Sequence, residues 1–250
     1  LNILLKQFPL PNSVSITMKE TAVCVIKSLT VQINQKVVLK KSFSENEDPV
    51  FDVKGTLIRL KEGNCFLFFE TFSMGKSQPF NALYQIKSDG SLKTVINADS
   101  LWQEKYGDDC YFSIDEVKNN KLLITTGCMN YRVGCFSMTL EYNLSNGKLK
   151  KNSSYSTDFS FASPDGIAPR SNSFTLASSI DVYKESSLET KSFKLKKNDM
   201  VMIMQVKLSS GKLYMKVMRA GDGKKGWISC NKTKPYANGS PLFLETFYMD

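Results

Sequence analysis

Apolar and polar residues alternate along much of this chain, which is the two-residue period of a strand with one buried face. In the early stretch 13–40, apolar positions recur at every second residue on both sides of the polar turn Asn34-Gln35-Lys36. The run from Cys65 to Phe69 is continuously apolar, but it has the length of a strand, whereas a membrane span needs about 20 apolar residues. Aromatic and β-branched residues are frequent, as in pleated sheets. The pattern predicts an all-β protein without a transmembrane segment.

Two later stretches, 58–96 and 114–148, show the same succession of strand, turn, strand, loop, strand, turn and strand. Tyr84 and Tyr142 occupy matching places in them, a few residues before Asp89-Gly90 and Asn146-Gly147. Such dipeptides supply the positive φ angles that a tight hairpin needs. A less regular third copy lies around residues 20–40. We therefore expect residues 1–170 to form a β-propeller-like domain of repeated hairpins, and the alternative is a sandwich-like domain whose hairpins resemble one another.

The segment 163–172 contains two prolines, a glycine and several turn-forming residues, which is typical of a linker between domains. It predicts a boundary between residues 1–170 and a second domain over 174–230. The remaining tail, 231–250, ends in an apolar stretch, so we expect it to pack back on the domain junction.

Residues 174–230 carry a more specific pattern. The step from Leu195 to Asp199 reads Leu-Lys-Lys-Asn-Asp and leads into a strand, a further strand contains Tyr214-Met-Lys-Val, and the last turn, Gly223 to Ile228, reads Gly-Lys-Lys-Gly-Trp-Ile. This pattern resembles the bacterial SH3-like (SH3b) family, whose members share an apolar-Lys-Lys-Gly-Asp step, a Trp/Tyr-x-Lys-Val strand and a closing Gly-x-x-Gly-Trp-Ile. Asn198 stands where that family usually has glycine, and asparagine also tolerates a left-handed backbone.

The resemblance implies an SH3-like barrel of the kind found in exported bacterial proteins, where it holds cell-wall peptides or neighbouring domains. It also implies a ligand-binding groove near Tyr183, Tyr214 and Trp227, because flat aromatic side chains bury a large area at little entropic cost. The alternative for Trp227 is that it fills the core of the barrel itself.

The net charge of +9 is concentrated towards the C-terminus, where residues 173–250 hold 13 Lys and Arg against 7 Asp and Glu. Such a surface attracts anionic partners through its long-range field. The chain shows neither a basic helix nor an aromatic RNA-binding motif, so nucleic acid is not the expected partner.

The chain contains no histidine and no Cys-x-x-Cys pair, so we expect no structural metal and no cofactor. Cys128 and Cys135 flank a hairpin tip and form the candidate disulfide. The alternative is that the cysteines are small buried hydrophobes, as we expect for Cys24 and Cys65.

The absence of histidine also removes the usual nucleophile and base pairs, and no glycine-rich phosphate loop is present, so the sequence favours a protein that is not an enzyme. A glycosidase with two carboxylates is the remaining catalytic alternative. Its candidate residues are Glu70, Asp108, Asp109, Asp115 and Glu116.

These observations together predict an extracytoplasmic bacterial binding or adaptor protein that recognises a cell-wall polymer or peptide, or a protein partner. The chain begins at Leu1 without an initiator methionine, as it would after removal of a leader, and a lipid anchor upstream is compatible with this. A domain excised from a longer cytosolic chain explains the same start. The alternative function is a structural interaction module of a surface assembly.

Overall fold

The protein is described here by a computed structural model. It covers residues 2–4, 13–20, 25–43, 49–60, 63–73, 81–102, 107–130, 132–153, 155–161, 172–230 and 241–245. Within these ranges every element is a β-strand except α1 (Ala98–Leu101), which is a single helical turn. The prediction of an all-β protein is confirmed. No helix in the described part of the chain is long and apolar enough to span a membrane.

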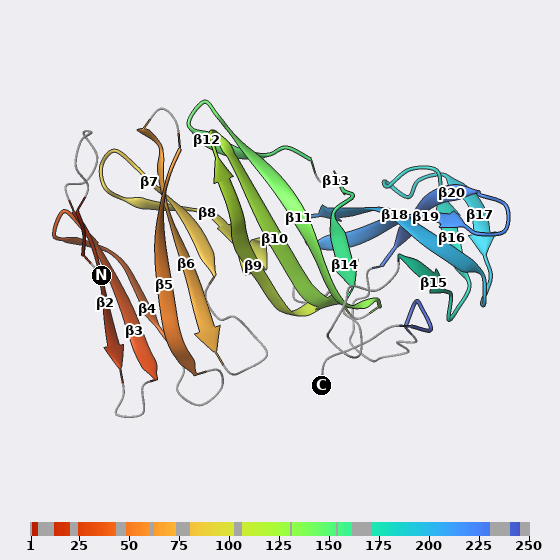
Figure 1. The fold of residues 1–250 in the computed structure, drawn as a ribbon, viewed down its shortest axis with the longest axis horizontal. Helices are drawn as coiled ribbons and strands as arrows, with labels where there is room; N and C mark the ends of the chain where they lie inside the picture. The colour runs from red at the N-terminus through yellow and green to blue at the C-terminus, as the bar shows by residue number, and fades with distance from the viewer. Residues whose placement is uncertain are drawn as a thin grey trace. The chain divides into compact units, whose positions relative to one another are not determined.

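Three meanders of four sequential antiparallel strands make up most of the first 151 residues (Figure 1). The first meander contains β1 (Asn2–Leu4), β2 (Ser13–Glu20), β3 (Ile26–Ile33) and β4 (Lys36–Ser42). The second contains β5 (Val50–Arg59), β6 (Cys65–Ser73), β7 (Ala82–Ile86) and β8 (Leu92–Asn97). The third contains β9 (Gly107–Lys118), β10 (Lys121–Asn130), β11 (Gly134–Ser145) and β12 (Lys148–Lys151).

The predicted hairpin turns adopt the backbone that their sequences favour. Asn34 and Gln35 have φ of 49° and 65°, and Asn146 and Gly147 have φ of 51° and 67°. Two successive positive φ angles give a turn whose twist matches that of the flanking strands. Tyr84 and Tyr142, which the sequence placed in equivalent positions, are both nearly buried.

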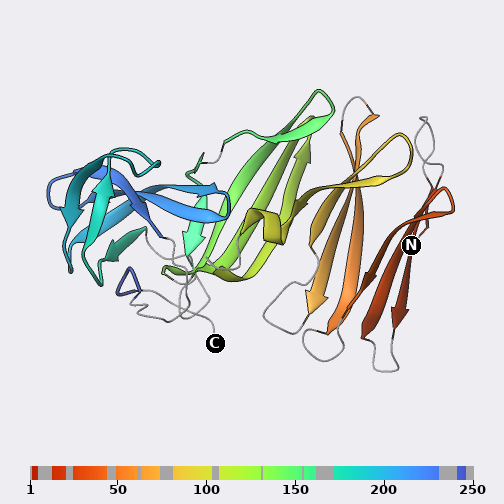
Figure 2. The same ribbon diagram turned by 180° about the vertical axis from the view of Figure 1, so that it is seen from behind.

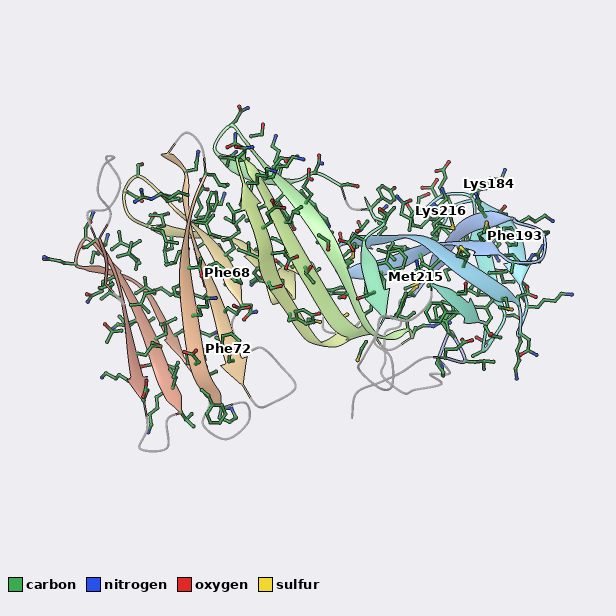
Figure 3. All side chains as sticks on the ribbon, in the orientation of Figure 1. Phe68, Phe72, Lys184, Phe193, Met215 and Lys216 are labelled. Atoms are coloured by element: carbon green, nitrogen blue, oxygen red, sulfur yellow. The ribbon has the colours of Figure 1, made fainter. Side chains whose placement is uncertain are left out.

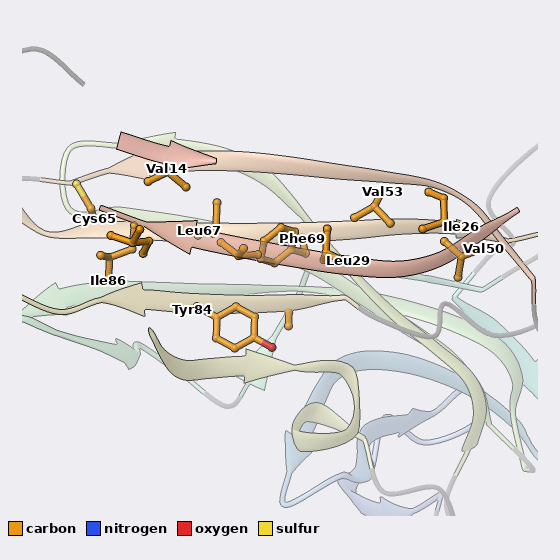
Figure 4. Packing of buried hydrophobic residues seen from close by; sticks show 13 residues of the cluster. Val14, Ile26, Leu29, Val50, Val53, Cys65, Leu67, Phe69, Tyr84 and Ile86 are labelled. Atoms are coloured by element: carbon orange, nitrogen blue, oxygen red, sulfur yellow. The ribbon is translucent and has the colours of Figure 1, made fainter. Parts of the chain in front are cut away.

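The core of the first two meanders explains the apolar run on β6. Cys65, Leu67 and Phe69 point into a cluster of buried side chains that β2, β3, β5 and β7 share (Figure 4). Phe66 and Phe68 point to the other face and are also buried, and the Phe68 ring lies 5.3 Å from that of Phe112 on β9. Because β6 is covered on both faces, it has no polar face and its sequence does not alternate.

A seven-stranded sheet contains the strands that the sequence assigned to a barrel. Its order is β13-β18-β19-β20-β16-β17, with β15 also paired to β18. The bounds are β13 (Tyr155–Ser156), β15 (Ser173–Thr175), β16 (Ile180–Tyr183), β17 (Lys191–Leu195), β18 (Met200–Ser209), β19 (Lys212–Arg219) and β20 (Lys225–Ser229). The hairpin of β18 and β19 is its longest (Figure 1, Figure 2).

This sheet does not close. One end of the strand order is β17, the other is β13 and β15, and no ladder among the described residues joins the two ends. The prediction of a closed barrel was therefore wrong, because β13 and β15 occupy the free edge of β18 that closure would require. The local expectation for Asn198 is confirmed, since its φ is 70°.

The chain divides into two compact units, and the division differs from the predicted linker at 163–172, of which only Asn172 is described. Unit 1 consists of Leu1–Ala98, Tyr111–Leu122 and Asn143–Lys150, and unit 2 consists of Asp99–Cys110, Leu123–Tyr142 and Lys151–Asp250. The strands of the seven-stranded sheet therefore share a unit with parts of β10 and β11.

A series of aromatic contacts connects the segments of unit 2. Phe136 on β11 packs against Trp102 and against Phe161 of β14 (Phe159–Phe161), with ring centroids 6.4 Å and 5.2 Å away. The series continues from Phe161 to Phe174 on β15 at 4.8 Å and from Phe174 to Phe243 at 4.7 Å. All five rings are nearly buried, so residues 241–245 are fixed to β15 by the same core that holds β11.

Gly226 on β20 provides a test of how tightly the seven-stranded sheet packs. A Cβ atom there would lie 2.7 Å from the backbone oxygen of Tyr183 and would also collide with the Val182 side chain. We predict that Gly226→Ala lowers the free energy of unfolding by about 3 kcal/mol, as overpacking does. Gly221→Ala is the matched control, because nothing lies within 4 Å of its added methyl group. Equal melting temperatures for the two variants would contradict the packing described here.

Candidate binding site

Two rows of side chains cross the seven-stranded sheet on the face opposite its core. In the first row Tyr183 pairs with Trp227, and Trp227 pairs with Lys216. In the second row Tyr214 pairs with Lys207, and Lys207 pairs with Tyr155 on β13. We call the set Tyr155, Tyr183, Lys207, Tyr214 and Trp227 the aromatic face.

Alternation along the strands shows that Trp227 points away from the core of the sheet. Its neighbour Ile228 is fully buried and pairs with Met215, which is also fully buried. Successive side chains of a strand point to opposite faces. Trp227 therefore shares its face with Lys216, which lies on the same sheet in Figure 3. Ile228 and Met215 are therefore buried on one face of the sheet, and Trp227 lies on the other face.

Trp227 is nevertheless only 6% exposed, because Tyr155 covers it. The two ring centroids lie 5.5 Å apart with their planes at 56°. Tyr155 itself is 41% exposed, and its hydroxyl lies 3.2 Å from the Oγ of Ser186 in the loop between β16 and β17. The aromatic ring nearest the solvent thus belongs to Tyr155.

Lys207 lies beside the rings of Tyr155 and Tyr214. Its Nζ is 5.2 Å from the ring centroid of Tyr155 and 5.9 Å from that of Tyr214, which is within the range of cation–π attraction. The same Nζ donates a hydrogen bond of 2.8 Å to Ser186 Oγ. The hydroxyls of Ser186 and Tyr155 are also hydrogen-bonded to each other. This hydrogen bond, followed by the charge of Lys207, lowers the pKa of Tyr155 from its usual value.

The sheet carries further lysines around the aromatic face. Lys184, directly after β16, is exposed and is labelled in Figure 3. Lys191 forms an exposed ion pair of 2.6 Å with Asp181, and such pairs contribute little to stability. Arg219 lies elsewhere on the sheet, where it packs over Phe193 and binds Asp222, so the pKa of Asp222 is held well below its usual range.

The structure thus brings Tyr183, Tyr214 and Trp227 onto one face of one sheet. Sequence reasoning missed Lys207 and Tyr155. The alternation of apolar and polar residues could have indicated Lys207. It lies between Val206 and Leu208, whose side chains are both fully buried, so its own side chain points to the opposite face. No sequence pattern indicated Tyr155, because it precedes the predicted barrel and lies on a strand of only two residues.

The candidate disulfide is not formed. The hydroxyls of Thr125 and Thr139 lie 3.4 Å apart across β10 and β11, so these two residues share a face. Cys135 is four residues from Thr139 and lies on that face, whereas Cys128 is three residues from Thr125 and lies on the buried face. The two sulfurs point to opposite sides of the sheet and are not bonded. Cys24 lies outside the described residues.

Burial governs the chemistry of two other cysteines. It raises the pKa of the Cys65 thiol, and it raises the pKa of Cys230, which follows β20, to about 12. Both side chains are buried hydrophobes in the described structure.

Two of the carboxylates considered for a glycosidase lie next to each other on β9. Asp115 and Glu116 are adjacent exposed residues on β9, so they point to opposite faces. Asp115 accepts a hydrogen bond from Ser113 instead. The side chains of Asp108 and Asp109 lie outside the described part of the structure.

Comparisons with known proteins give no relative from which a function can be transferred. No protein-family model matches the chain, and no curated protein matches it. The functional argument therefore starts from the aromatic face.

The hydrogen bond between Ser186 and Tyr155 can be tested by titration. We predict that Ser186→Ala raises the pKa of Tyr155 towards its usual value, because the donor that stabilises the phenolate is lost. The pKa is measured by NMR from the ring signals of labelled tyrosine. Ser187→Ala removes the neighbouring hydroxyl and should leave the titration unchanged, and a shift of the same size in both variants would contradict the assignment.

Proposed function

We propose that this chain is a non-catalytic binding protein of the bacterial cell exterior and that the aromatic face is its binding surface. The observation that carries the proposal is the presence of aromatic rings and a lysine ammonium together on the face opposite the core. Ile228 and Met215 are buried on the opposite face, so the rings and the ammonium share one side of the sheet.

The chemistry of the aromatic face suits an extended ligand that carries anionic groups. Tyrosine and tryptophan rings bury a large area with little loss of side-chain entropy. Lys207 adds a charge beside the rings, and residues 173–250 around it carry most of the net charge of the chain, with 13 Lys and Arg against 7 Asp and Glu. Cell-wall peptide, an anionic wall polymer and an acidic segment of a protein partner all present such groups.

The resemblance of residues 174–230 to bacterial SH3-like domains supports the proposed location and ligand class. It rests on Gly223 to Ile228 and on the turn at Asn198, and members of that family hold cell-wall peptides in exported proteins. The lack of histidine supports a binding role over catalysis.

A structural interaction module is the second candidate, and the contact between Tyr155 and Trp227 favours it. In that case the aromatic face holds β13 in place and binds no external ligand. Tyr214 distinguishes the two functions, because its ring lies beside Lys207 on the side away from β13 and a bracing role has no use for it.

Retention on purified peptidoglycan tests the proposal. We expect the wild-type protein to be retained at low salt and to be released as salt rises, because the lysine contribution is screened. We predict that Lys207→Met and Tyr214→Ala each weaken retention by about tenfold, which corresponds to about 1.4 kcal/mol and is typical of a desolvated cation–π or aromatic contact.

Lys148→Met is the matched control, because it removes one exposed lysine from β12 and leaves the seven-stranded sheet intact. Its retention should equal that of the wild type. Absence of wild-type retention at low salt would exclude the cell-wall ligand. Equal losses in Lys207→Met and Lys148→Met, with no loss in Tyr214→Ala, would show that only the total charge matters.

A further inference from the structure

We infer that the Tyr155 side chain occupies the binding position over Trp227 in the ligand-free protein, and that the natural ligand displaces it with a tyrosine-like ring of its own. This inference rests on the proposed function and specifies the ligand group that the aromatic face accepts. Of the three ligand classes proposed above it selects the acidic segment of a protein partner, because wall peptides and wall polymers carry no aromatic ring. In the ligand-free protein the Tyr155 ring thus occupies the place of the ligand's ring.

The burial of Trp227 supports the first part of this inference. The indole lies on the outer face of the sheet and is only 6% exposed, and the ring that covers it is 41% exposed. A ligand ring that reaches Trp227 from solvent must therefore take the place of Tyr155.

The Tyr155 ring is held by side chains, namely Trp227, Lys207 and Ser186, whereas the backbone on both sides of it is held by separate hydrogen bonds. Before β13, the Asn152 amide donates to the Glu141 carbonyl at 2.7 Å, and after β13 the Asp158 carbonyl accepts from the Thr139 amide at 3.0 Å. Rotation of the Tyr155 side chain about its own bonds therefore moves the ring off Trp227 without a change in the backbone, and such rotations of exposed residues are fast.

The groups around the ring define what fits in its place. Trp227 supplies a flat apolar surface, and the Lys207 ammonium lies 5.2 Å from the ring centroid. At the tip, the Ser186 and Tyr155 hydroxyls are hydrogen-bonded to each other, and Lys207 donates to the same serine oxygen. These groups accept an aromatic ring that ends in an oxygen with partial or full negative charge. A peptide tyrosine meets these requirements.

Rescue of a truncated variant with p-cresol, which is the tyrosine side chain as a free molecule, tests the inference. In Tyr155→Ala the ring position is vacant, and small aromatic molecules bind such vacated places. We expect p-cresol in the millimolar range to shift the indole N–H signal of Trp227 in this variant. The indole of Trp102 is the internal reference, because it is fully buried and donates to Thr126.

The wild-type protein should bind p-cresol more weakly. If Tyr155 covers Trp227 for about 90% of the time, the apparent affinity falls by about tenfold relative to Tyr155→Ala. Tyr155→Thr, which keeps a strand-forming residue on β13, should give the same gain in affinity. Phe193→Ala removes a ring that packs under Arg219 on the same sheet, and it should behave as the wild type.

Three results would overturn the inference. The first is that the wild type and both Tyr155 variants bind p-cresol with equal affinity. The second is that p-cresol shifts the Trp102 signal and leaves the Trp227 signal unchanged, and the third is that the protein binds N-acetylglucosamine and not p-cresol. The last result would assign the position to a sugar ring. Failure of the wild type to bind peptidoglycan would reject only the cell-wall ligand, because the p-cresol measurement does not depend on it.

Discussion

The register of β18, β19 and β20 is the constraint on which the seven-stranded sheet and its candidate site both depend. Because side chains alternate along a strand, one register places Val206, Met215 and Ile228 together in the core and leaves Lys207, Tyr214 and Trp227 on the other face. A shift of one residue would exchange the two sets. Burial of the aliphatic set therefore also positions the aromatic set.

The aromatic series from Trp102 to Phe243 performs a different task. It joins segments that are far apart in the sequence, and its members belong to β11, β14, β15 and the segment 241–245. Since β14 pairs with β11 and β13 pairs with β18, residues 155–161 connect the two sheets of unit 2. The position of Tyr155 over Trp227 follows from this connection. The candidate site therefore includes a residue of β13, which precedes the six consecutive strands β15 to β20.

Local features of the fold were predictable because they depend on neighbours in the sequence. Alternation and the turns at Asn34, Gly90 and Asn146 identified the strands of the first three meanders, and Asn198 identified a turn of the last sheet. The resemblance to SH3-like domains placed Tyr183, Tyr214 and Trp227 near one groove. Three features could not be predicted in this way, because they depend on pairings between distant strands. They are the division into units, the open end of the last sheet and the position of Tyr155. Such pairings leave no periodic signal, and β13 is too short to show any period.

Cys230 illustrates how packing decides the reactivity of a side chain. Burial raises the pKa of its thiol and so lowers the share of the thiolate, which is the form that attacks a disulfide. The Cys230 side chain is also fully buried, so an oxidant or another thiol reaches the sulfur only when the C-terminal sheet opens.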